Sequence, residues 1–178
     1  MEFIANTFSA LWNSLEHLGV WAYWIVFLIA FADSLFVIGA FTGGGALVVL
    51  SGVLVSRGVY DFTIMATFAA LGALLGGSIS YSLGRFFKHH VLVRPHHEAR
   101  KHHMVRVERL LEKYDGVGII IGRFLGPLGS ITAFFAGFSG MKARIFTFWN
   151  LAASVAWGAG FVLLGALLSE SAELLPFF

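Results

Sequence analysis

Two charged residues of opposite sign stand inside long apolar stretches of this sequence. Asp33 follows the apolar run 27–32, and Arg123 follows the run 118–122. A charged side chain at membrane depth is costly unless it is paired or hydrated, so it marks a functional site by default. We expect Arg123 to bind an anion such as a lipid phosphate through its fork of donors, and Asp33 to carry a proton in the same cavity. The alternative is a structural ion pair that fixes packing.

Each charged residue lies near a group of helix-breaking glycines. These glycines are Gly43, Gly44, Gly45, Gly126 and Gly129, and the second group also contains Pro127. Glycine lets backbone N–H groups approach a phosphate closely, and a broken helix end adds a favourable dipole. Irregular backbone at membrane depth must be sheltered by protein or line a wet cavity. We therefore expect these five glycines to contact a headgroup together with Arg123.

The segments that carry these residues are apolar enough to lie in a membrane. Of the 178 residues, 58% are hydrophobic and only 12% are charged. Four stretches lack Asp, Glu, Lys, Arg and His, namely 34–56, 62–83, 124–141 and 145–169. About 20 apolar residues are needed to cross a bilayer. The composition argues against a single soluble globule and predicts an all-α, multi-pass integral membrane protein. The absence of cysteine excludes thiolate metal sites and disulfides.

The cationic residues indicate how the chain crosses the membrane. Eight of the 12 Lys and Arg and six of the 7 His lie within 85–113, which we expect to be cytoplasmic. Lys142 and Arg144 form a second cluster, expected on the same side. If every apolar stretch spanned, the two clusters would lie on opposite faces. The segment 117–140 is therefore predicted to enter and leave on the cytoplasmic face as a re-entrant hairpin.

The expected arrangement has spans near 20–38, 62–84 and 145–168, and two re-entrant helical hairpins of opposite orientation at 36–56 and 117–140. Broken elements at corresponding positions of two oppositely oriented halves are typical of an inverted-repeat transporter.

We expect a single membrane domain, 20–168, with short additions at both ends. The parts are an N-terminal interfacial amphipathic helix (1–19), a first half (20–84), a basic, histidine-rich amphipathic segment (85–115), a second half (116–168) and a short acidic tail (169–178).

The central segment contains three histidine pairs, at 89–90, 96–97 and 102–103. Only Glu98 and His102 have the i, i+4 spacing that suits a metal. The favoured interpretation is a basic surface against anionic lipid headgroups, with metal binding and pH sensing as alternatives. We expect no metal, no cofactor and no nucleic-acid partner. The chain has no Walker A loop, nucleophile elbow, zinc-protease motif or pair of intramembrane aspartates, so we expect no enzymatic activity.

Several motifs, taken in order, resemble the DedA family of bacterial inner-membrane proteins, also called the VTT-domain family. They are Phe31–Leu35, Phe41–Leu54, Leu75–Arg85, Gly122–Ser130 and Ala136–Met141, and the resemblance runs over about 20–168. It implies paired re-entrant hairpins and movement of undecaprenyl phosphate or phospholipid across the inner membrane, driven by the proton motive force. It also implies two acids and two arginines in the hairpins.

The resemblance assigns Asp33 to the first acid and Arg123 to the first arginine. Gly45 stands where the second acid is usual, Gly129 where the second arginine is usual, and Gly77 where many members carry Asp. We expect a proton-coupled lipid transporter or flippase. The alternatives are a non-transporting scaffold or lipid-binding protein that keeps the fold, and a channel-like or ion-antiport activity. The many Gly and Ala residues also permit a homo-oligomer.

Overall fold

The structure, a computed structural model, describes residues 18–39, 43–92, 116–125 and 128–173. These residues form six α-helices and no strand, so the all-α prediction is confirmed for them. The helices are α2 (Trp21–Ser34), α4 (Gly45–Ser56), α5 (Phe62–Leu92), α7 (Val117–Phe124), α8 (Leu128–Ser139) and α9 (Ala143–Glu173). Several predictions fall outside the described residues, namely nearly all of the 1–19 helix, Gly126, most of the 85–115 segment, the histidine pairs at 96–97 and 102–103, and the end of the 169–178 tail.

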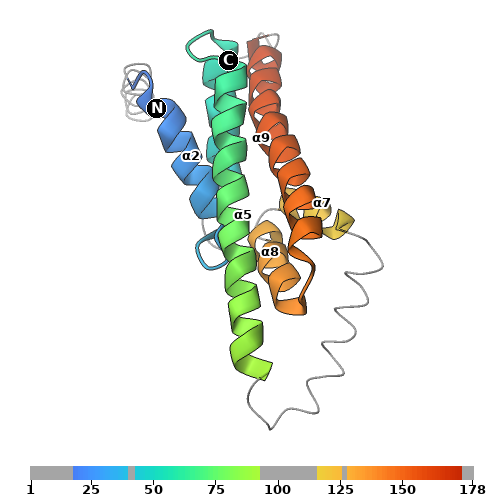
Figure 1. The fold of residues 1–178 in the computed structure, drawn as a ribbon. Coiled ribbons are helices and arrows are strands. Elements are labelled where there is room, and N and C mark those ends of the chain that lie inside the picture. The colour runs from blue at the N-terminus through green and yellow to red at the C-terminus, as the bar shows by residue number, and fades with distance from the viewer. Residues whose placement is uncertain (1–17, 40–42, 93–115, 126–127, 174–178) are drawn as a thin grey trace, which may run out of the picture.

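Two long apolar helices, α5 and α9, run side by side through the molecule (Figure 1). Each has 31 residues, a length of about 46 Å at the helical rise. Phe62–Lys88 and Ala143–Ser171 are long and apolar enough to cross a membrane. Large apolar side chains are exposed along both helices, among them Leu71, Leu75 and Ile79 on α5 and Leu163, Leu164 and Leu167 on α9. Soluble monomers rarely expose so much contiguous apolar surface, so this surface suits hydrocarbon better than water.

The first hairpin is made of α2 and α4, and its limits differ from the expected ones. The helices have 14 and 12 residues, about 20 Å each, so neither matches the span expected at 20–38. Helix α2 ends at Ser34 and the chain turns back. Gly39 permits this turn, because a Cβ there would lie 1.8 Å from the carbonyl oxygen of Asp33. The two limbs are thus residues 21–34 and 45–56, whereas the sequence predicted both limbs within 36–56.

The second hairpin, made of α7 and α8, lies within the predicted limits of 117–140. Helix α7 ends at Phe124 and α8 begins at Leu128, on either side of Pro127, which cannot donate a backbone hydrogen bond. The two helices cross closely at Gly122, where a Cβ would lie 2.2 Å from Oγ1 of Thr132.

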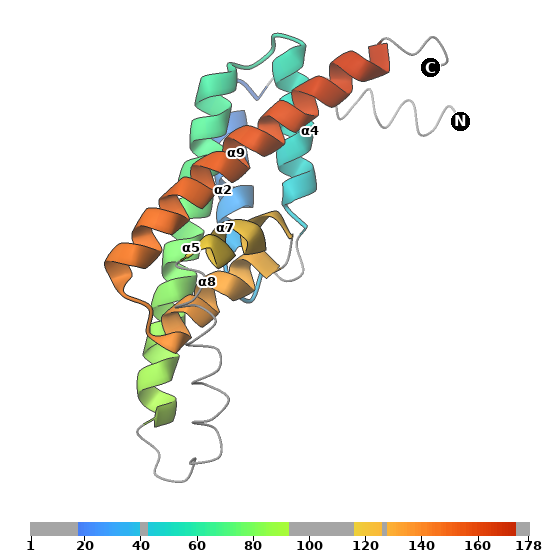
Figure 2. The ribbon, with the colours of Figure 1, turned by 90° about the vertical axis from the view of Figure 1, so that its right-hand side faces the viewer.

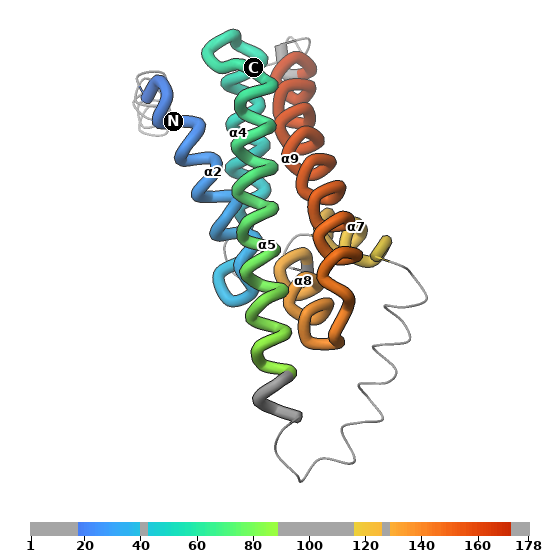
Figure 3. Tube along the Cα trace, viewed as in Figure 1, coloured from blue at the N-terminus to red at the C-terminus, as the bar shows by residue number. Residues whose placement is uncertain are grey.

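Each hairpin packs its second helix against the long helix of the other half, as Figures 2 and 3 show for α4 and α9. Helix α4 meets α9 at Gly52 and Gly165, and α8 meets α5 at Gly137 and Gly84. A Cβ at any of these four glycines would come within 1.9–2.1 Å of a carbonyl oxygen of the facing helix. Only glycine permits this approach, so these four residues fix both helix crossings.

The two hairpins also meet each other in the middle of the molecule. The ring of Phe36, just after α2, stacks on the ring of Phe134 in α8, with centroids 3.9 Å apart. The backbone N–H of Phe36 donates to Oγ of Ser80 on α5 at 2.9 Å, and that hydroxyl donates to the carbonyl of Ser34 at 2.8 Å. The end of α2 is therefore held against both α5 and the second hairpin.

Candidate functional site

Arg123 lies near the end of α7 and is only 7% exposed. Its Nη1 donates to Oδ1 of Asn150 at 2.8 Å, and its Nη2 donates to Oγ of Ser34 at 2.9 Å. Nη2 also donates to the carbonyl oxygen of Ala73. These acceptors come from α9, α2 and α5, so the guanidinium joins four helices. Each of the three acceptors is formally neutral.

Asn150 holds the other side of this network and was not among the predicted site residues. It is fully buried, and its Nδ2 donates to the carbonyl of Leu74 at 3.1 Å and to Oγ of Ser78 at 3.3 Å. The sequence carries one signal that could have identified it, since an amide inside the uncharged stretch 145–169 needs a partner. Its acceptors on α5 depend on helix packing and could not be read from the sequence.

Asp33, next to the last residue of α2, is half-buried and lies at the start of α4. Its Oδ1 accepts a hydrogen bond from the backbone N–H of Gly44 at 2.7 Å. The partial positive charge of a helix N-terminus favours a carboxylate in this place. The negative charge of Asp33 also acts favourably on the guanidinium of Arg123. The structure thus brings the two predicted charged residues into one electrostatic environment.

The three glycines of the first group have different surroundings. Gly44 touches Asp33, because a Cβ there would lie 2.8 Å from the Asp33 Cβ. Gly43 has a φ of +53° and open space around it, so its role is to form the turn. Gly45 faces away from Asp33 toward Phe161 of α9, whose ring would lie 2.7 Å from an added Cβ. Of the three, the structure places Gly44 in contact with the carboxylate.

The positions at which the family resemblance implies additional charges, Gly45, Gly77 and Gly129, are tightly filled in this chain. A Cβ at Gly129 would lie 3.0 Å from the Cα of Arg123, and Phe161 stands against Gly45. A Cβ at Gly77 would lie 2.7 Å from Oδ1 of Asn150 and 3.3 Å from Nη1 of Arg123. The amide of Asn150 therefore occupies the space that a side chain at position 77 would enter.

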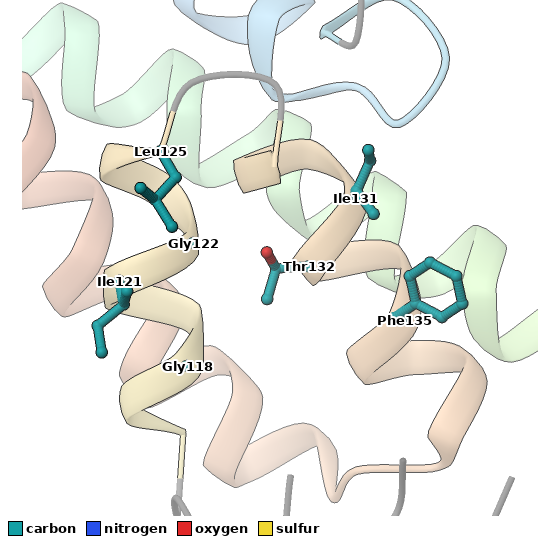
Figure 4. A pocket seen from close by; sticks show the side chains of 7 residues that line it. All are labelled: Gly118, Ile121, Gly122, Leu125, Ile131, Thr132 and Phe135. Carbon is teal, nitrogen blue, oxygen red and sulfur yellow. The ribbon is translucent and has the colours of Figure 1, made fainter. Parts of the chain in front are cut away.

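An apolar groove of about 450 Å³ runs between α7 and α8, beside the helix that carries Arg123 (Figure 4). Its described lining residues are Gly118, Ile121, Gly122, Leu125, Ile131, Thr132 and Phe135. Thr132 supplies the one polar side chain of this lining and points between the two helices. Such a groove is chemically suited to a hydrocarbon chain.

Comparison with known proteins gives a consistent family assignment. The VTT domain family matches residues 37–167. Protein DedA of Escherichia coli (strain K12) is 28% identical over 160 residues, which cover 88% of this chain and 73% of that protein. Inner membrane protein YqjA of the same strain is 27% identical over 190 residues, covering 99% of this chain and 84% of that protein.

A third relative, inner membrane protein YghB of E. coli (strain K12), is 26% identical over 165 residues, which cover 88% of this chain and 75% of that protein. No solved structure matches the chain significantly. Two of these relatives are named as inner membrane proteins, which agrees with the long apolar helices α5 and α9. The predicted resemblance is thereby confirmed, and this chain is a membrane protein of the DedA, or VTT-domain, family.

Proposed function

We propose that this protein moves a phosphate-bearing lipid across the bacterial inner membrane, with Arg123 as the headgroup contact and Asp33 as the proton carrier. The observation that carries the proposal is the buried guanidinium of Arg123, which bonds to neutral oxygens at the junction of α2, α5, α7 and α9. The activity is transport without covalent chemistry.

The bonding of Arg123 suits exchange with an anion. A lipid phosphate offers charged oxygens in the geometry that a guanidinium binds in a bidentate manner, and charge-assisted hydrogen bonds are roughly twice as strong as neutral ones. A phosphate that reached this site would compete with the side chains of Ser34 and Asn150 for the same donors. Arg123 would therefore gain stronger hydrogen bonds by exchanging its neutral partners Ser34 and Asn150 for a phosphate.

The groove between α7 and α8 supplies a place for the lipid chain. It adjoins Gly122, the residue before Arg123, and its walls are almost wholly apolar. A lipid bound in this way would place its chain against Ile121 and Phe135 and its headgroup toward the Arg123 site. Both parts of an amphipathic substrate would then have a matching surface on one hairpin.

Coupling to protons is assigned to Asp33. Protonation of its carboxyl group would remove the negative charge that acts on Arg123 and weaken the attraction to the Gly44 amide. The guanidinium would then attract an external anion more strongly. Deprotonation would restore the negative charge of Asp33, which competes with the lipid phosphate for Arg123, and would favour release of the lipid.

The membrane arrangement in this proposal is that of two oppositely oriented re-entrant hairpins related by an inverted repeat. Two features support it. The short helices of both hairpins fall below the length of a span, and each hairpin packs on the long helix of the other half. Gly84 and Gly165, which make the two crossings, each lie 22 residues after the first residue of a 31-residue helix.

The test is translocation of labelled phospholipid and of undecaprenyl phosphate in liposomes that contain the purified protein, with and without an imposed pH gradient. We expect transport by the natural protein, loss of transport in Arg123→Ala, and loss of the response to the pH gradient in Asp33→Asn. Arg85→Gln is the control, because Arg85 is exposed and lies outside the site. Full activity of a correctly folded Arg123→Ala protein would contradict the proposal.

The second candidate function is a lipid-binding scaffold that does not transport. It is favoured by one observation, namely that glycine stands at positions 45 and 129, where the family resemblance implies a second acid and a second arginine, and that a Cβ at either position would lie 2.7 Å from the Phe161 ring or 3.0 Å from the Cα of Arg123. In the same liposome assay this function predicts lipid movement at the rate of protein-free vesicles for every lipid and pH gradient. The Asp33→Asn protein would then be indistinguishable from the natural one.

A further inference from the structure

A second hollow, separate from the Arg123 site, lies at the start of α9. It has a volume of about 730 Å³ and is lined by Lys142, Ala143, Arg144, Ile145, Phe148 and Trp149. None of these residues takes part in the hydrogen bonds of Arg123. The hollow combines two cations with exposed apolar side chains, at the end of a helix that is long enough to span a membrane.

The turn that carries Lys142 is held firmly against α5. The Tyr81 hydroxyl donates to the carbonyl of Met141 at 2.5 Å, and Nζ of Lys88 donates to the carbonyl of Ser139 at 2.6 Å. The Tyr81 ring also stacks on that of Phe146 at 4.1 Å between centroids. The backbone between α8 and α9 is therefore held by three contacts with α5.

The cations of this hollow lack an anionic partner within the part of the chain that the structure describes. Lys142 and Arg144 are exposed, and their side chains make no hydrogen bond or ion pair with the residues that the structure describes. The first turn of α9 contains no acidic residue, so both cations face the positive end of the helix dipole. An anion bound between them would relieve this repulsion.

The apolar wall of the hollow indicates what kind of anion fits. Phe148 is 65% exposed beside the two cations, and Trp149 packs over Gly116, where a Cβ would come 2.0 Å from the indole Cδ1. Tryptophan at the end of a spanning helix is typical of the boundary between headgroups and acyl chains, and Phe148 adds an exposed apolar ring next to it. A free inorganic anion would bind the two cations but would make no contact with this apolar wall.

We propose that this hollow binds the headgroup of an anionic phospholipid of the surrounding membrane, with its phosphate between Lys142 and Arg144 and the start of its acyl chains against Phe148. The site is distinct from the Arg123 site and does not require that the protein transports lipid. Its ligand is held at the membrane surface and stabilises the junction of α8, α9 and α5.

The test is a binding titration of the full-length protein in a zwitterionic detergent, with short-chain phosphatidylglycerol, short-chain phosphatidylcholine and inorganic phosphate as the three ligands. Binding is followed by the thermal shift and by native mass spectrometry of the complex. The variants are Lys142→Gln combined with Arg144→Gln, and separately Phe148→Ala. The matched controls are Arg85→Gln, which removes an exposed cation from α5, and Leu151→Ala, which removes an exposed apolar side chain from α9.

We expect saturable binding of phosphatidylglycerol, weakened about 10-fold or more by loss of both cations, and weaker binding in Phe148→Ala. The two controls should change the dissociation constant by less than about twofold. The part of the binding that is lost in the Lys142 and Arg144 variant belongs to this hollow, and it is measured without a translocation assay, which separates this site from the proposed function.

Three results would overturn the proposal. Equal weakening in Arg85→Gln would indicate diffuse surface charge without a site. Binding of phosphatidylcholine as tight as that of phosphatidylglycerol would show that the two cations do not select an anionic headgroup. Inorganic phosphate that binds as tightly as phosphatidylglycerol, with no effect of Phe148→Ala, would assign the hollow to a free anion.

Discussion

The two halves of the molecule place a charged residue at the same point and secure it in different ways. Asp33 and Arg123 each stand one residue before the end of the first helix of their hairpin. Arg123 is bonded to side chains or carbonyls of α2, α5 and α9, whereas the hydrogen bond of Asp33 to Gly44 stays within its own hairpin. The arginine is thus bonded to three other helices, whereas the hydrogen bond from Gly44 to the aspartate joins the two helices of one hairpin.

The strongest test of the likeness between the halves is to add a methyl group at one crossing in each. Gly52→Ala and Gly137→Ala should each lower the free energy of unfolding by about 3 kcal/mol, because the new Cβ would overlap a carbonyl of the facing helix. Thermal unfolding in detergent measures the change. Gly160→Ala is the control, since its nearest heavy atom would be 3.9 Å away. A large loss in only one variant would show that the two crossings are not equivalent.

The difference between the two charged residues should appear when each loses its charge. Arg123→Leu should cost about 2–3 kcal/mol, because it leaves buried acceptors on Ser34, Ala73 and Asn150 without their donor. Asp33→Asn should cost about 1 kcal/mol or less, since the amide oxygen can still accept from Gly44. Chemical denaturation of both proteins checks this order. Equal costs would contradict the view that Arg123 is the more firmly held residue.

The role of Asn150 as the link between halves predicts an intermediate effect. Asn150→Ala should lower stability by about 2 kcal/mol, because it removes a buried acceptor of Arg123 and leaves a cavity. Ser154→Ala is a matched control on the same helix, also fully buried, whose hydroxyl donates to the carbonyl of Asn150. It should cost about 0.5–1 kcal/mol. Similar losses in the two variants would mean that Asn150 acts as packing alone.

The smallest effect is expected at the turn that holds Asp33. Gly44→Ala should cost about 1 kcal/mol and displace the carboxylate, because the new Cβ would lie 2.8 Å from the Asp33 Cβ. Gly43→Asn is the comparison, since asparagine tolerates a positive φ and the space around Gly43 is open. The response of transport to a pH gradient should weaken in the first variant only. An equal loss of the pH response in both variants would mean that the conformation of the turn, and not the position of the Asp33 carboxylate, causes the effect.

The sequence singled out Asp33 and Arg123 because the cost of charge in an apolar stretch is a local property, and the structure places both near the ends of the first helices of their hairpins. Helices α7 and α8 lie within the segment 117–140, on either side of Pro127, whose effect on a helix is local. The first hairpin has other limits than the sequence predicts, because the chain turns back directly after Ser34. This turn brings the backbone of Gly39 so close to the carbonyl of Asp33 that no Cβ would fit there. The acceptors of Arg123 on α5 and α9 lie 50 and 27 residues away. Such contacts depend on how the helices pack, and no short segment of the sequence reveals that packing.

The glycine crossings also set the order in which the protein can be assembled during synthesis. Gly52 meets Gly165, so α4 has no place to dock until a segment made 113 residues later has left the ribosome. At the usual rate of translation this delay is about 6–23 s. During that time the surface of α4 around Gly52 lies without its α9 partner. The crossing of α5 and α8 needs only Gly84 and Gly137, which are both made before Gly165, so the crossing that joins α4 to the second half is the last to form.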